Sequence, residues 1–304
     1  SGLVNMVTGD SKLNSGSLSI STGDSSTAKA GDITVSGGSS AANRGSTISL
    51  AAGSSSASTG GDISLTSGIS TKAGSSSGDI DILTSDGTST VSSGALLLRT
   101  GNAANGNTGN INLLSGDSSL GNAGSVSISP GSSAVSGSDM LLSGGSVSTT
   151  GTGGDVIITS GVSSSSSSGA VSIQTANSGS SGVSGEILLK TGIAAIGTSG
   201  SLILSTGVGT VGNAGKISLS VGSGVAGKGG NVRISAGTAT NGVGGDINLS
   251  AGSGLSTGGN IDLVSGAATN TATGSININS ATTATARSGL VNMVTGDSKL
   301  NSGS

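Results

Sequence analysis

Acidic side chains that directly follow glycine are the residues of this chain that could perform chemistry. Asp32, Asp62, Asp155 and Asp246 each follow a glycine and precede a branched aliphatic residue. A continuous column of carboxylates would predict a cation-binding ladder, whereas single Asx residues at corners cap turns with their side-chain oxygens. Serine, threonine, alanine or lysine interrupts the column in most repeats, as expected where stacked carboxylates would repel each other. We therefore interpret these four aspartates as corner residues.

Enzymatic chemistry lacks its usual residues in this sequence. There is no histidine and no cysteine, so a zinc site, a thiol nucleophile and a Ser-His-Asp triad all lack an essential member. The nearest carboxylate pair in the sequence, Asp79 and Asp81, would face solvent together on a strand. No repeat is long enough to build a cleft. We predict that the chain is not an enzyme and that it uses no cofactor and no metal.

The composition restricts the partners that the chain can have. Its 304 residues include 59 glycines, one proline and no aromatic residue, and the net charge is -3. Eleven scattered basic residues give no stripe for a phosphate backbone, and nothing can stack on bases, so we expect no nucleic acid partner. No apolar run approaches the ~18 residues of a membrane span. Glycine and serine richness alone would indicate disorder, but the apolar residues recur at fixed places.

Two nested repeats organise the sequence. Residues 1–17 recur without change at residues 288–304, an offset of 287 residues. We therefore divide the chain into one long repeat unit, residues 1–287, and the start of the next identical unit, residues 288–304, and expect a tandem array in the parent protein. Within the unit, a motif of glycine, a polar residue and two aliphatic residues separated by one position recurs. Nineteen steps of 14 to 17 residues lead from the motif at Val4 to the motif at Val291.

The shorter repeat predicts the fold. Its alternation of aliphatic and polar residues is typical of a strand, with Ile33 and Val35 on one face. Stacking such strands about 4.8 Å apart would pair every backbone group with the next repeat. We predict an all-β fold, a single parallel β-solenoid of about 19 coils of about 15 residues, with no separate domains. Its core ladder is predicted to comprise Ile33, Val35, Ile63, Leu65, Ile111, Leu113, Ile187, Leu189, Ile217, Leu219, Ile247 and Leu249.

The other half of each repeat carries looser apolar positions. Val135, Val225 and Leu255 are examples, and we expect them to form the opposite wall of a thin coil. Glycines flank the predicted strands, where tight corners need backbone conformations that glycine adopts without strain.

The motifs GDISLTSG at residues 61–68 and GDINLSAG at residues 245–252 resemble the repeats of Gly/Ser-rich tandem-repeat β-solenoid fibre proteins. These include haemagglutinin-like adhesins and the surface filaments of algae, protists and large viruses. The resemblance covers the whole chain and lies in its composition and strand–turn rhythm. It implies a structural protein, a stiff filament or surface appendage that is extracellular or on the cell or virion surface. The expected partner is the chain itself, through end-to-end continuation and lateral bundling, and glycans can be carried on the Ser/Thr-rich corners.

Two alternative functions remain open at this point. A repeat stalk of a cell-surface adhesin would need a distinct binding domain elsewhere in the parent chain. An ice-binding solenoid would need a flat threonine ladder between the paired aliphatics. That column includes Thr34, Ser49, Asp81 and Leu97, which differ in charge and size. Thermal hysteresis would identify ice binding, and we expect none.

Overall fold

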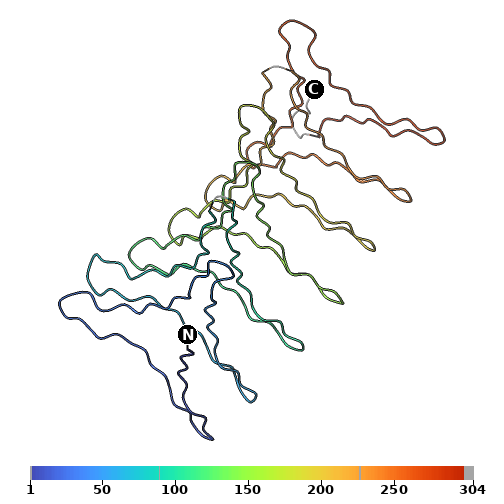
Figure 1. Ribbon diagram of the computed structural model, residues 1–304. Coiled ribbons are helices and arrows are strands. Elements are labelled where there is room, and N and C mark those ends of the chain that lie inside the picture. Colours follow the sequence, from blue (N-terminus) through green and yellow to red (C-terminus); the bar gives the residue numbers. More distant parts are fainter. Residues whose placement is uncertain (1, 89, 226, 298–304) are drawn as a thin grey trace. The chain divides into compact units, whose positions relative to one another are not determined.

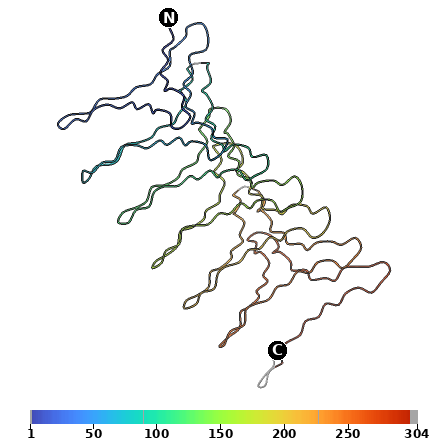
Figure 2. The same ribbon diagram turned by 90° about the horizontal axis from the view of Figure 1, so that it is seen from below.

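The computed structural model describes residues 2–88, 90–225 and 227–297 of the chain. Within these residues there is no α-helix and no β-strand, and the backbone is coil interrupted by short bends (Figures 1 and 2). The predicted all-β parallel β-solenoid is therefore wrong. The two features that decide this, the hydrogen bonds of the backbone and the exposure of the side chains, are described below.

One bend falls in each repeat of the sequence. A bend follows about half a repeat after the first aliphatic residue of each motif, as at residues 41–43 after Ile33. Figure 1 shows the chain running out to such tips and turning back. The repeat is therefore preserved as a spacing of bends. Within the described residues the bends lie at 12–13, 26–28, 41–43, 56–58, 72–74, 90, 104–106, 119–121, 134–135, 148–151, 164–166, 180–182, 195–197, 210–212, 225 and 227, 240–242, 255–256, 269–271 and 284–286.

The chain divides into two units, Ser1–Val156 and Ile157–Ser304. Each unit has the same local organisation, in which apolar segments alternate with bends. The recurring 17-residue sequence opens the first unit and returns in the second. Of its second copy, residues 288–297 are described and residues 298–304 lie outside the described residues.

Backbone hydrogen bonds close many of the loops at their necks. The N–H of Gly61 donates to the carbonyl of Gly53 at 2.9 Å, and that of Gly154 donates to the carbonyl of Gly145 at 2.8 Å. Each of these bonds joins the start of one motif to the end of the motif before it. The described residues contain eight such bonds, which end at Ser46, Gly61, Gly78, Gly154, Gly169, Gly245, Gly259 and Gly274.

The span of these bonds explains why the solenoid prediction fails. They join residues seven to ten positions apart, whereas stacked coils would need bonds between residues about 15 positions apart. The backbone groups at the necks are thus paired within one loop. A single bond per loop also leaves most donors and acceptors to water, so no ladder of the kind that defines a sheet is formed.

No described residue is buried, so the described part of the chain has no hydrophobic core. The accessible surface of the chain is 30056 Å². A compact protein of 27.9 kDa would expose about 11,000 Å², and its fully unfolded chain about 40,000 Å². The predicted opposite wall is also absent: Val135, Val225 and Leu255 are 96%, 103% and 109% exposed. They lie at bend tips, so nothing faces the aliphatic pairs across a coil.

Candidate functional site

The aliphatic pairs form the most regular feature of the described chain. All twelve predicted ladder residues are exposed, but to two different extents. The first member of each pair is between 51% and 58% exposed, and the second member is between 63% and 77% exposed. The first members are Ile33, Ile63, Ile111, Ile187, Ile217 and Ile247, and the second members are Val35, Leu65, Leu113, Leu189, Leu219 and Leu249. The pairs are thus partly covered, while the apolar residues at the bend tips are not.

The repeated 17-residue sequence shows where this partial cover comes from. Val4 and Val291 occupy the same position in two identical sequences. Val4 is 85% exposed and Val291 is 45% exposed. Since the local sequence is the same, the difference must come from neighbouring repeats, and a repeat precedes Val291 but not Val4 in the structure. Neighbouring repeats therefore shield each other's aliphatic residues.

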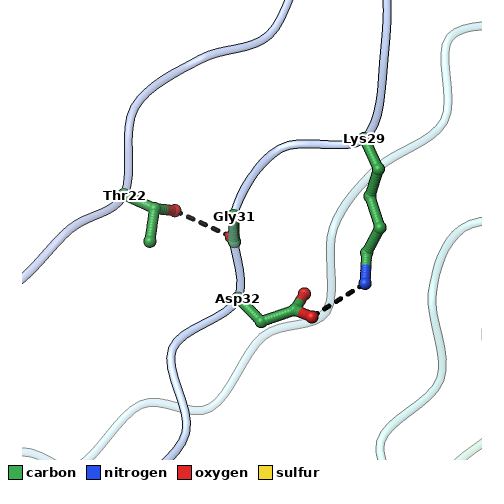
Figure 3. Close-up of polar contacts among 4 residues, drawn as sticks. All are labelled: Thr22, Lys29, Gly31 and Asp32. Carbon is green, nitrogen blue, oxygen red and sulfur yellow. Dashed lines mark hydrogen bonds and ion pairs between the residues drawn. The ribbon is translucent and has the colours of Figure 1, made fainter.

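The first predicted corner residue, Asp32, forms an ion pair within its own loop (Figure 3). Its carboxylate oxygen Oδ2 accepts a hydrogen bond from Nζ of Lys29 at 2.8 Å, with both side chains largely exposed. Beside it, Oγ1 of Thr22 donates to the carbonyl of Gly31 at 3.0 Å. Two polar contacts thus join the ends of this loop at Asp32. An exposed pair of this kind contributes at most about 1 kcal/mol.

The other three predicted corner residues lie at loop necks. Asp62, Asp155 and Asp246 each directly follow the glycine whose N–H closes its loop. In the described part of the chain none of their carboxylates takes part in a hydrogen bond or an ion pair. The backbone of the preceding glycine, and not the carboxylate, joins the two sides of these necks. The structure does not bring the four aspartates together.

Hydroxyl groups at the bends are the capping groups that the sequence reasoning missed. The side-chain oxygen of Ser163 accepts hydrogen bonds from the N–H groups of Ser165 and Ser166 at 3.4 and 2.9 Å. Among the described residues, the same arrangement of a hydroxyl two or three positions before its donor occurs in nine loops. The accepting residues are Ser11, Ser25, Ser40, Ser55, Ser70, Ser118, Ser133, Ser163 and Thr283. Serine or threonine just before each bend was the available signal, because these hydroxyls bond to nearby backbone groups.

Close backbone approach makes glycine necessary at particular necks. A Cβ atom on Gly144 would collide with the carbonyl oxygen of Gly154, and one on Gly254 would collide with the carbonyl oxygen of Thr257. By contrast, the space around the positions of Gly101 and Gly116 is open. The glycines of the chain therefore differ in how strongly the loops depend on them.

The described residues hold no group of three or more acidic, histidine or cysteine side chains that could bind a metal ion. They also form no pocket. A search of the described residues for a helix long and apolar enough to cross a membrane finds none. The candidate functional feature of this chain is therefore its repeated surface: the aliphatic pairs, the necks and the hydroxyl-capped tips.

Comparisons with known proteins give no match: no family model, no curated protein and no solved structure is similar to this chain at the significance required.

Proposed function

We propose that this chain is a repetitive structural segment of an extracellular filament or surface appendage, in which repeat units follow one another end to end. The observation that carries the proposal is the agreement between two periods. The sequence repeats in nineteen steps of 14 to 17 residues, and the described backbone bends once in each of them. Every repeat thus contributes the same structural element.

The mutual shielding of repeats supports the same proposal. A valine that follows another repeat is about half as exposed as the identical valine at the start of the chain. Repeat proteins gain stability from contacts between neighbours, and each unit depends on the next. Adding units then adds length and contacts together, which is the property that a spacer or thread requires.

Solution scattering tests the shape that this function requires. We would compare the 304-residue chain with a chain extended by one further 287-residue unit. An end-to-end thread should nearly double its radius of gyration. A compact protein that doubles in length increases its radius of gyration about 1.3-fold, and an unfolded chain about 1.5-fold. A chain of the same composition in scrambled order is the control and should follow the unfolded value. An increase of 1.5-fold or less for the native order would contradict the proposal.

Immunogold labelling tests the proposed location. Antibodies raised against the chain should decorate filaments or appendages on intact, unpermeabilised cells or virions of the source. Preimmune antibodies provide the control. Labelling that appears only after permeabilisation would refute the surface location.

A further inference from the structure

The partly covered aliphatic pairs form a repeated apolar surface, here named the ladder face. It consists of the first and second aliphatic residues of each motif, such as Ile187 with Leu189 and Ile247 with Leu249. Every pair in the described residues remains about half exposed or more, or in one case slightly less, with Val291 the most covered at 45%. Single exposed apolar residues are ordinary on a protein surface, but a repeated apolar surface indicates an interaction site.

The area of the ladder face is large enough for a stable interface. Burying one aliphatic side chain fully removes roughly 60–120 Å² from water, from 1.5–3 kcal/mol at about 25 cal/mol per Å². With about 60% still exposed, each ladder residue offers roughly 40–70 Å². The ten pairs of the unit Ser1–Val156 then offer roughly 800–1,400 Å². A stable interface buries about 800 Å² on each partner, so one unit alone provides enough.

The spacing and charge of the repeats favour a second copy of this chain as the occupant. The steps between motifs are unequal, with lengths of 14, 15, 16 and 17 residues in an irregular order. A second copy in the same register has the same order of steps, so each pair meets a pair along the whole unit. The net charge of -3 over 304 residues also gives little repulsion between copies.

We propose that the ladder face binds the ladder face of a second copy of this chain, repeat against repeat and in the same register. This inference rests on the proposed structural function and adds the partner and the contacting residues. The bend tips face away from the contact in this arrangement. It explains why the apolar residues of the pairs are partly covered by neighbours while those of the tips are fully exposed.

Sedimentation of the whole chain and two matched variants tests the contact. The native chain should associate as its concentration rises from about 1 µM to 1 mM. The ladder variant changes five isoleucines that are each the first member of a pair. The tip variant changes five apolar residues near the bends that are fully exposed. The ladder variant carries Ile187→Ser, Ile217→Ser, Ile247→Ser, Ile261→Ser and Ile276→Ser, and the tip variant carries Ile193→Ser, Ile196→Ser, Val211→Ser, Val225→Ser and Leu255→Ser.

The two variants remove equal numbers of apolar side chains, so they separate a specific contact from general hydrophobic association. We expect the ladder variant to weaken association at least tenfold, and the tip variant to change it less than twofold. Equal weakening by both variants would overturn the proposal, and so would a native chain that stays monomeric throughout. A monomeric chain that still lengthens in proportion to its units would overturn this inference and leave the proposed function standing.

The register is tested by fluorescence. The chain has no cysteine, so Ser64→Cys provides a single site for a pyrene label between Ile63 and Leu65. Copies in the same register place two labels side by side and should give excimer emission. A mixture of chains labelled at Ser64→Cys and chains labelled one repeat earlier, at Ser49→Cys, should give much less excimer than either labelled chain alone. Association without this difference would refute the common register.

Discussion

The neck beside Gly144 offers the sharpest test of the loop architecture. A Cβ atom at this position would collide with the carbonyl oxygen of Gly154, which is backbone and cannot rotate away. The N–H of Gly154 closes the loop by donating to the carbonyl of Gly145 at 2.8 Å. Gly144→Ala should therefore force the neck apart and break this bond. A net contribution of about 1 kcal/mol for one hydrogen bond corresponds to an about fivefold shift toward the open loop.

Amide hydrogen exchange followed by NMR measures that shift directly. The Gly154 amide should exchange about fivefold faster in Gly144→Ala than in the native chain. Gly116→Ala is the matched control, since a Cβ atom there meets nothing within 4 Å. It should leave exchange unchanged or slow it slightly, because alanine restricts the unfolded chain more than glycine does. Unchanged exchange at Gly154 in Gly144→Ala would refute the closed neck.

Two further predictions concern the bend tips. Gly74 has a φ of 79°, so Gly74→Ala should cost about 1 kcal/mol and speed exchange of the Ser75 amide, while Gly74→Asn should cost less, as asparagine tolerates this conformation better; equal effects of the two variants would contradict the backbone explanation. Ser163→Ala removes the acceptor of two backbone hydrogen bonds and should make the amide of Ser166 exchange about twofold to fivefold faster, while Ser168→Ala should have no effect; equal exchange in both variants would exclude hydroxyl capping.

The sequence predicted the period of the structure but not its hydrogen bonding. The repeat located every bend within the described residues, because glycine and hydroxyl residues favour turns wherever the strand pattern stops. The alternation of Ile63 and Leu65 also correctly marked a position that neighbours partly cover. Both features depend on local sequence, which a single chain displays in full.

The stacking of repeats could not be predicted in the same way. Period-two alternation indicates a chain segment with one apolar face, but it does not identify the segment that will cover that face. The interpretation assigned this role to residues such as Val225 and Leu255, which instead lie fully exposed at the tips. The corner aspartates were placed at loop ends correctly, but closure depends on the backbone of the adjacent glycine, as at Gly61 before Asp62. Backbone pairing is common to all residue types, so residue identity carried little information about it.

The duplicated sequence separates what a repeat does alone from what it does in series. Val4 and Val291 share the same neighbours in sequence, yet the exposed fraction falls from 85% to 45% when a repeat precedes the valine. If cover comes from the preceding repeat, then each added repeat improves the burial of the one after it, and stability must rise with the number of repeats faster than with composition. Selection on such a chain acts on repeat number and spacing more than on any single side chain. That favours a function set by length, because a binding or catalytic site would depend on a few particular residues instead.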